Sequence, residues 1–229
     1  MHIPDGVLKP AVWAPLAAVS VVSVAVASAA ARKRLEDQSI PLIGVMGAFV
    51  FAIMMLNFPI AAGISDHIVG GALLAIVLGP SVAVVSMAAI VTIQALIFRD
   101  GGIAALGANV FNMAIVSTLV SYLIYRALAR ALPRASVVIG TFLGVMAAAT
   151  CAAAWVMLSQ PYGLKFFLAM ELTHAVSGAV EAVVTLAVVK ALRAWDLDRS
   201  RREAANADSH TESDAPHGDH RLLPAPAVV

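Results

Sequence analysis

Seven apolar segments, separated by short polar or Gly/Pro-containing stretches, follow one another along most of the chain. A helix of about 20 mainly apolar residues crosses a bilayer, and most of the segments approach that length. The pattern therefore predicts an all-α polytopic membrane protein with seven transmembrane helices. The predicted helices cover residues 11–31, 40–57, 68–78, 81–98, 103–125, 136–158 and 166–192.

The third segment, residues 68–78, is shorter than the other six. At about 1.5 Å per residue it spans half of a ~30 Å hydrocarbon core. Gly70-Gly71 stands at one end and Gly79-Pro80 at the other. Interrupted segments of this kind often line a binding site, because irregular backbone at membrane depth must be covered by protein or water. The alternative is a single helix over residues 68–98 with a kink at Pro80, which gives six spans.

The distribution of basic residues favours seven spans over six. With the amino terminus outside, the inner loops hold most Lys and Arg residues, whereas the outer loops hold only Lys9, Arg99 and Lys165. This is the positive-inside bias of membrane proteins, and a six-span arrangement would lose it. We therefore expect a multi-pass protein of the cell (inner or plasma) membrane with a cytoplasmic carboxy terminus. The inner-side residues are Arg32, Lys33, Arg34, Arg126, Arg130, Arg134, Lys190, Arg193, Arg199, Arg201 and Arg202.

Composition agrees with this class and adds a domain boundary. Hydrophobic residues make up 61% of the chain and charged residues 13%, and the mean hydropathy is +0.89, whereas globular chains average about 25% charged residues. The net charge of +1 gives no indication about nucleic acid, but aromatic residues are only 6% and no basic patch is interleaved with them, so we expect no nucleic-acid partner. After Trp195 the sequence turns charged and then Ala/Pro-rich. We therefore expect an integral membrane domain over residues 1–195 and a disordered cytoplasmic tail over residues 196–229.

The first two residues form a metal chelator when the amino terminus is free. The Met1 α-amine, the His2 backbone nitrogen and the His2 imidazole close a five-membered and a six-membered ring on one ion, and leave one in-plane position vacant. His67, in a Gly-bounded loop predicted on the same outer face, can fill that position. Four nitrogens in a plane suit Ni²⁺ or Cu²⁺ better than tetrahedral Zn²⁺. The plainer alternative is a disordered terminus.

The chelate requires that the first apolar segment is not a cleaved signal peptide. Residues 11–31 are longer than a usual signal-peptide core, and the basic cluster follows them instead of preceding them, which favours retention. Cleavage after Ala27-Ser28-Ala29, which resembles a processing site, is the alternative.

Four further polar residues are candidates for supporting the metal ligands. Ser65 and Asp66 precede His67 and can orient imidazoles; alternatively, Asp66 and His67 cap the helix that follows. Asn109 and Asn112 are three residues apart and share one helix face. Their amides can hold the metal loop from below or bond neighbouring helices.

The last apolar segment carries Glu171, His174, Gly178 and Glu181 on one helical stripe. Ionisable residues within a membrane span are functional candidates. A second hypothesis is therefore a self-sufficient secondary transporter or channel for a divalent cation that uses Glu171, His174 and Glu181. A polar helix interface is the simpler interpretation. The sequence contains no Walker-type loop, Cys/His zinc spacing or HExxH motif, so we expect a transport subunit without its own ATPase, not an enzyme.

Four stretches of the sequence resemble the CbiM/NikM family, the substrate-specific membrane subunits of cobalt and nickel energy-coupling factor (ECF) transporters. They are MHIPDG at the start, NFPIAAGISDHIVGGALLAIVLGPSVAVV, QALIFRDGGIAALGANVFNMAIV and HAVSGAVEAVVT. The resemblance covers almost all of residues 1–195 and implies seven helices and capture of Ni²⁺ or Co²⁺ outside. It also implies that the ligands are the Met1 amine, the His2 amide and imidazole, and the His67 imidazole.

The resemblance further implies partners for this chain. ECF importers of this kind combine it with a transmembrane coupling subunit, two ABC ATPase subunits and often a small extra membrane subunit. There are departures from the family pattern: Ala61-Ala62-Gly63-Ile64-Ser65 stands where members often have Gly-Gly-Thr-Ser, and Asp66 replaces a commonly small or apolar residue. They concern the surroundings of the ligands and not the ligands themselves. The sequence does not decide between nickel and cobalt, since the same nitrogens serve both.

Overall fold

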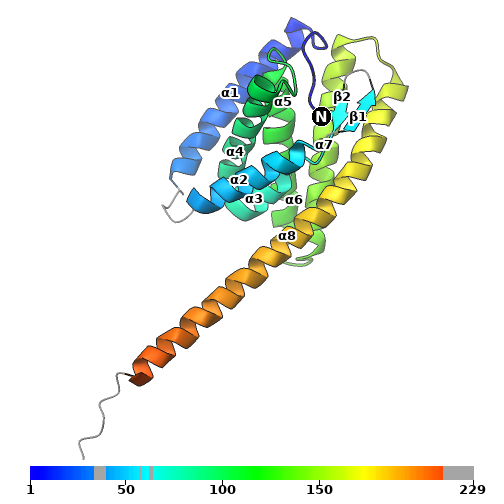
Figure 1. Ribbon diagram of the computed structural model, residues 1–229. Coiled ribbons are helices and arrows are strands. Elements are labelled where there is room, and N and C mark those ends of the chain that lie inside the picture. Colours follow the sequence, from blue (N-terminus) through cyan, green and yellow to red (C-terminus); the bar gives the residue numbers. More distant parts are fainter. Residues whose placement is uncertain (34–39, 57, 62–63, 214–229) are drawn as a thin grey trace, which may run out of the picture. The chain divides into compact units, whose positions relative to one another are not determined.

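The structure is a computed structural model that describes residues 1–33, 40–56, 58–61 and 64–213 (Figure 1). Nearly all of this part of the chain is helical, and two short strands, β1 (Phe58–Ala61) and β2 (Ile64–Asp66), pair antiparallel with Phe58 opposite Asp66. Two π-helical stretches, Gln94–Phe98 and Phe111–Ser117, widen the helical path. The α-helices are α1 (Pro10–Arg32), α2 (Ile40–Met54), α3 (Gly71–Leu78), α4 (Pro80–Ile93), α5 (Leu106–Val110), α6 (Thr118–Leu128), α7 (Ala135–Ser159) and α8 (Leu164–Ser213).

Five helical stretches in the described chain are long and apolar enough to cross a bilayer, and α2 is apolar but shorter. This agrees with the predicted class, a helical membrane protein. The number of seven spans and their orientation stay predictions. The five stretches are Pro10–Arg32, Pro80–Phe98, Leu106–Leu128, Ala135–Ser159 and Leu164–Trp195.

The third predicted segment forms a short separate helix, α3. Gly70 precedes it with φ +80°, and Gly79 follows it with φ +84° and ψ 158°. Residues with a Cβ rarely adopt these backbone angles. Pro80 then begins α4, at a position where its missing N–H costs no helical hydrogen bond. The alternative of one kinked helix over residues 68–98 is therefore not formed.

Regular structure continues beyond Trp195, where the sequence predicted none. The α8 backbone is helical to Ser213, and residues 214–229, which include His217 and His220, lie outside the described residues. Arg, Glu and Ala, which are frequent after residue 198, favour helix, and extension of an existing helix needs no new nucleus. The chain divides into two compact units, Met1–Val189 and Lys190–Val229. The proposed domain boundary at residue 195 stays a prediction.

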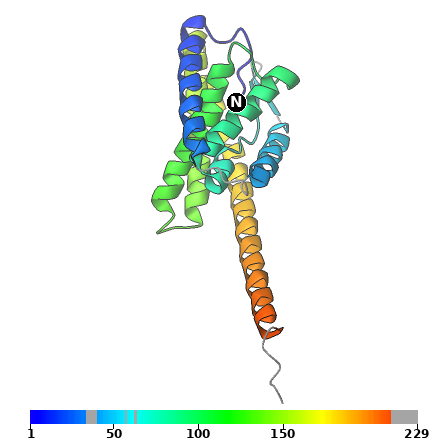
Figure 2. The same ribbon diagram turned by 90° about the vertical axis from the view of Figure 1, so that its left-hand side faces the viewer.

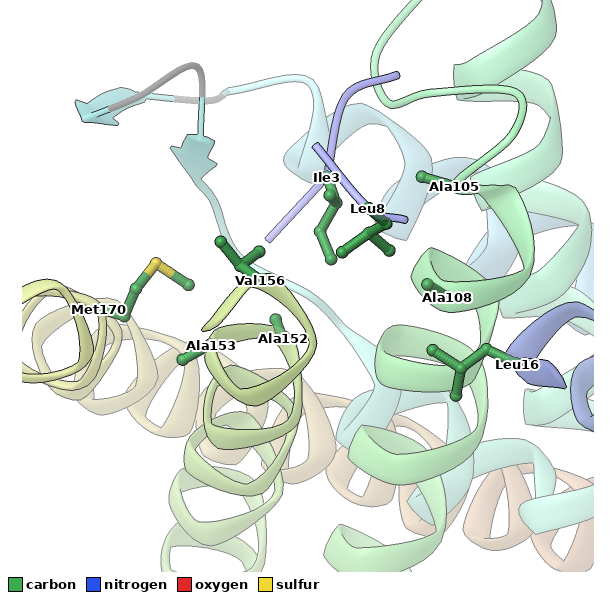
Figure 3. Packing of buried hydrophobic residues seen from close by; sticks show 9 residues of the cluster. All are labelled: Ile3, Leu8, Leu16, Ala105, Ala108, Ala152, Ala153, Val156 and Met170. Carbon is green, nitrogen blue, oxygen red and sulfur yellow. The ribbon is translucent and has the colours of Figure 1, made fainter. Parts of the chain in front are cut away.

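The amino-terminal segment, residues 1–9, packs into the helical unit instead of projecting from it. Ile3 and Leu8 are buried in a cluster that also takes side chains from α1, α5, α7 and α8 (Figure 3). Burial of one such aliphatic side chain contributes roughly 1.5–3 kcal/mol, which favours an ordered terminus. The remaining buried members of the cluster are Leu16, Ala105, Ala108, Ala152, Ala153, Val156 and Met170.

Candidate metal centre

The first residues of the chain are buried and held by backbone hydrogen bonds. Met1 is 0% exposed and His2 3%. The Ile3 N–H donates to Oδ1 of Asn109 (2.9 Å), and the Asn109 amide donates back to the Ile3 carbonyl (3.1 Å). The Gly102 N–H donates to the same carbonyl (2.9 Å). The backbone of Ile3, directly after His2, is thus fixed on both its N–H and its carbonyl. The disordered terminus considered above is not what this fold contains.

Contacts further along the amino-terminal segment extend this attachment. The Asp5 carboxylate accepts hydrogen bonds from the backbone N–H groups of Ile103 (3.0 Å) and Ala104 (2.8 Å). The Gln160 side chain donates to the Val7 carbonyl at 2.7 Å. In both ribbon views the marked amino terminus lies beside the β hairpin that precedes His67 (Figures 1 and 2). These hydrogen bonds therefore hold the amino-terminal segment in place, with its first residues near His67.

His67 lies between β2 and α3 with its ring orientation fixed. Its N–H donates to Oδ1 of Asp66 (2.8 Å), and its Nδ1 lies 2.9 Å from the Ile68 carbonyl. A carbonyl oxygen only accepts, so Nδ1 carries the proton and Nε2 keeps a lone pair. The ring is 2% exposed. A neutral imidazole with a free Nε2 is the form that binds a metal ion.

The two histidines meet although 64 positions of sequence separate them. Their ring centroids are 4.8 Å apart and the rings are inclined by 29°. Both ring nitrogens of His2 and Nε2 of His67 are buried and have no hydrogen-bond partner within the described part of the chain. Buried polar atoms are normally paired, so these unpaired nitrogens indicate a site for a ligand. Each neutral imidazole has one nitrogen with a lone pair, so the two rings together can supply two nitrogen ligands.

Burial keeps the Met1 amino group and the two imidazoles uncharged near neutral pH. It lowers the pKa of the Met1 amino group from 8.0 to about 5, against the opposing effect of the Asp66 and Asp100 carboxylates. Burial and the nearby amino group lower the His2 pKa from 6.5 to about 3. The pKa of His67 is well below 6.5, mainly through burial. Metal ligands must be deprotonated, so the amine and the imidazoles are already in the form that binds a cation.

Asp100 lies beside these nitrogens, although the sequence analysis did not single it out as a candidate. Its Oδ2 lies 3.8 Å from Nε2 of His2. The turn approaches closely because Gly101 has φ +98°, and a Cβ there would stand 3.1 Å from Nδ1 of His2 and 3.0 Å from Nδ2 of Asn109. An acidic residue followed by two glycines was the available signal. Asp66 and Asp100 thus provide negative charge beside the nitrogen set.

The four residues predicted to support the ligands make different contacts. Asp66 contacts His67, and Asn109 holds Ile3, as described above. Asn112 accepts a hydrogen bond from the Trp155 indole (3.0 Å), a helix-to-helix contact, and does not reach the His67 loop through any described hydrogen bond. The Ser65 backbone belongs to β2, but its side chain lies outside the described residues.

The polar stripe of α8 does not converge on one ion. Glu171 accepts a hydrogen bond from Thr150 (2.9 Å), and Glu181 binds backbone N–H groups before α3. His174 uses Nδ1 to donate to the Met170 carbonyl (2.7 Å), with Nε2 3.4 Å from Asp66. No group of three or more His, Cys, Asp or Glu side chains in the described chain forms a metal site. The candidate centre has only two such side chains and depends on main-chain nitrogens for the rest.

Comparisons with known proteins agree with a transport role. A family model described as "Cobalt uptake substrate-specific transmembrane region" matches residues 2–198. The chain is 38% identical over 224 residues to the fused nickel transport protein NikMN of Rhodobacter capsulatus, which covers 89% of this chain and 63% of that protein. It is 30% identical over 203 residues to the cobalt transport protein CbiM of Acetoanaerobium sticklandii, with 84% of each covered.

A solved structure gives the same result for the fold. A crystal structure described as a transition metal transporter superposes with a TM-score of 0.81 at 39% sequence identity. The match covers 86% of this chain and 94% of that chain. The fold of this chain is therefore similar to that of a protein described as a transition metal transporter.

Proposed function

We propose, since the chain belongs to the CbiM family of cobalt-uptake membrane proteins, that it captures Ni²⁺ or Co²⁺ as the substrate-specific subunit of an ECF-type ABC importer. The observation that carries this proposal is the contact between His2 and His67, with ring centroids 4.8 Å apart, beside a buried amino group. The membership of a nickel and cobalt transport family supports the choice of ion.

Four nitrogens of this chain form the proposed binding plane. The Met1 amine, the His2 backbone nitrogen and Nδ1 of His2 supply three of them in two fused chelate rings. Nε2 of His67 supplies the fourth, since its Nδ1 is committed to the Ile68 carbonyl. The His2 amide loses its proton to the solvent when the ion binds. Asp66 and Asp100 compensate the charge of the bound cation and attract it from solution.

The proposed orientation places this centre outside. Seven helices, an outer amino terminus and a cytoplasmic carboxy terminus are supported by the excess of Lys and Arg on one set of loops. The chain is then a multi-pass protein of the inner or plasma membrane, in contact with the lipid bilayer. The ion is captured on the outer face and leaves the protein on the cytoplasmic side.

Energy for uptake comes from partners in this proposal. The sequence has no Walker-type phosphate-binding loop, so ATP hydrolysis requires two ABC ATPase subunits joined to this chain by a transmembrane coupling subunit. A small extra membrane subunit completes the assembly. The self-sufficient transporter considered above finds less support, because Glu171 and Glu181 are each engaged in other contacts.

Nickel titration calorimetry on the purified full chain tests the proposal. We expect His2→Ala and His67→Ala each to abolish high-affinity binding, because each removes a ligand from one plane. His210→Ala, which removes a histidine outside the unit Met1–Val189, is the matched control and should bind as the wild type does. Unchanged affinity in either His2→Ala or His67→Ala would contradict the site.

A further inference from the structure

Helix α8 meets the His67 loop, residues 66–70, at two points one helical turn apart. Ser177 donates from Oγ to Oδ1 of Asp66 at 3.0 Å. Glu181 accepts hydrogen bonds from the backbone N–H groups of Val69 (2.7 Å) and Gly70 (2.9 Å), one on each carboxylate oxygen. The two α8 side chains are therefore bonded to both ends of the loop that carries His67.

Glu181 binds the two backbone N–H groups directly before α3, those of Val69 and Gly70. Neither group has a partner within the helix, and Gly70 has no side chain of its own that could add a contact there. Glu181 is 1% exposed, so water does not compete for its oxygens. Gly70 itself has φ +80°, and a Cβ there would stand 2.6 Å from Cγ1 of Val50. The loop is thus held between α2 and α8.

The hydrogen bonds from Ser177 and to Glu181 both involve groups that orient the His67 imidazole. The Asp66 oxygen that accepts the Ser177 hydroxyl also accepts the His67 N–H (2.8 Å). The Ile68 carbonyl that fixes Nδ1 of His67 belongs to the peptide group completed by the Val69 nitrogen, which Glu181 binds. Loss of the Ser177 hydrogen bond therefore loosens the Asp66 carboxylate, and loss of the Glu181 hydrogen bonds loosens the Ile68 carbonyl. Each of these two groups orients the His67 ring.

We propose that Ser177 and Glu181 are positioning residues for metal capture, which hold His67 so that Nε2 faces the amino-terminal nitrogens. This inference rests on the proposed function, since it assigns a role toward the same bound ion. The polar residues on this face of α8 then hold the His67 loop in place. A conformational change of α8 within the unit Met1–Val189 would act directly on a metal ligand.

Glu171 provides the matched control on the same helix. It is a carboxylate two helical turns or more from Glu181, and its described hydrogen bond joins it to Thr150 of α7, not to the loop. Glu171→Gln makes the same chemical change as Glu181→Gln without touching residues 66–70. Ser177→Ala and Ser177→Thr form a second pair, in which only the first removes the hydroxyl.

The experiment measures nickel affinity by calorimetry and the electron paramagnetic resonance spectrum of Cu²⁺-loaded protein, with the purified full chain. Changes in residues around metal ligands cost typically 10–100-fold in affinity, so we expect about that loss for Glu181→Gln and a smaller loss for Ser177→Ala. The Cu²⁺ spectrum should show fewer bound nitrogens. Ser177→Thr and Glu171→Gln should behave as the wild type does. Hydrogen exchange of metal-free protein should show faster exchange at Val69 and Gly70 in Glu181→Gln only.

The outcomes separate the two proposals. Wild-type affinity and spectrum in both Glu181→Gln and Ser177→Ala, together with lost binding in His67→Ala, would overturn the positioning role and leave the metal site intact. Wild-type binding in His67→Ala would instead overturn the proposed function. If Glu181→Gln does not fold, the Ser177→Ala and Ser177→Thr pair decides: equal affinity in these two contradicts the inference.

Discussion

The protonation of individual nitrogen atoms decides whether the proposed centre can bind a cation. An exposed chelate would carry protons at neutral pH, because a free amine has a pKa near ~7.7–8.0 and a free imidazole near ~6.5. Here burial lowers the Met1 pKa to about 5 and the His2 pKa to about 3. The fold therefore supplies neutral ligands in surroundings where two carboxylates, Asp66 and Asp100, favour a cation.

These shifts predict an unusual pH dependence of nickel affinity. The folded amine and the His2 imidazole are already neutral above about pH 5, and burial holds the pKa of His67 well below 6.5. Near neutral pH, only the His2 amide therefore releases its proton on binding. Calorimetry should give a slope of about one in log affinity against pH from 8 to 5.5, and a steeper fall below about pH 5. A slope of two or more already near pH 7 would show that the ligands are protonated before binding and contradict the buried centre.

The pKa shift of the Met1 amine also determines whether stability of the metal-free protein rises or falls with pH. The unfolded amine has a pKa of 8.0 and the folded amine about 5, so the unfolded state binds more protons between these values. The contribution of the amino group to the free energy of unfolding is therefore fully present above pH 8 and is lost as the pH decreases through this window.

Gly101 allows a second residue-level prediction. Gly101→Ala places a side chain at φ +98° and brings its Cβ to 3.1 Å from Nδ1 of His2. Strain of this kind costs of order 1–3 kcal/mol, and the contact displaces the His2 ring. Gly6→Ala is the control, since Gly6 has φ +80° but nothing within 4 Å of an added Cβ. Both variants should lower the melting temperature, and only Gly101→Ala should weaken nickel binding. Equal nickel affinity in the two would contradict the close packing of the turn on His2.

At the scale of helices and strands, sequence prediction succeeded where length and apolar character decide the structure. The first predicted segment, 11–31, is close to α1 (Pro10–Arg32), and the sixth, 136–158, is close to α7 (Ala135–Ser159). The short third helix was found because two Gly-containing boundaries mark it. The strands β1 and β2 were missed, since pairs of three or four residues leave no clear alternation, and the π-helical stretches have no recognisable local signal.

The candidate ligands could be predicted because two terminal residues form a chelate by chemistry alone. The prediction that His67 joins them depended on the assumed membrane topology. In the described fold the His2 and His67 rings are in direct contact. The roles proposed for Asp100, Ser177 and Glu181 could not be predicted from the sequence. Each acts across more than 95 positions of sequence, and helical periodicity shows only that Glu181 faces inward, not what it binds.

For the whole molecule, the centre is assembled from parts that are distant in sequence but belong to one compact unit. The amino-terminal segment, the His67 loop, the turn at Asp100 and helix α8 up to Glu181 all lie within Met1–Val189. Nothing in the second unit contributes a described ligand contact. Nickel capture should therefore depend on the first unit alone.

Removal of the residues after Trp195 tests this statement. The truncated chain keeps every proposed ligand and positioning residue, so its nickel affinity by calorimetry should equal that of the full chain within about twofold. The full chain with His210, His217 and His220 all changed to Ala serves as a companion. Strongly reduced affinity in either protein would show that the carboxy-terminal histidines take part in binding.

The most direct measurement concerns the amino group of Met1, because a free terminal amine distinguishes the nitrogen plane from any site made of side chains. Nickel titrations should compare the native chain, verified by intact mass to begin at Met1, with a chain extended by one Gly before Met1. A Met1→Leu chain, released from an amino-terminal fusion so that Leu carries the terminal amine, keeps the chelate and serves as the control for packing. We expect the extension to weaken binding by more than about 100-fold, beyond the range typical of residues around a ligand, with little change in the control. Equal nickel affinity of the extended and native chains would contradict the proposed centre.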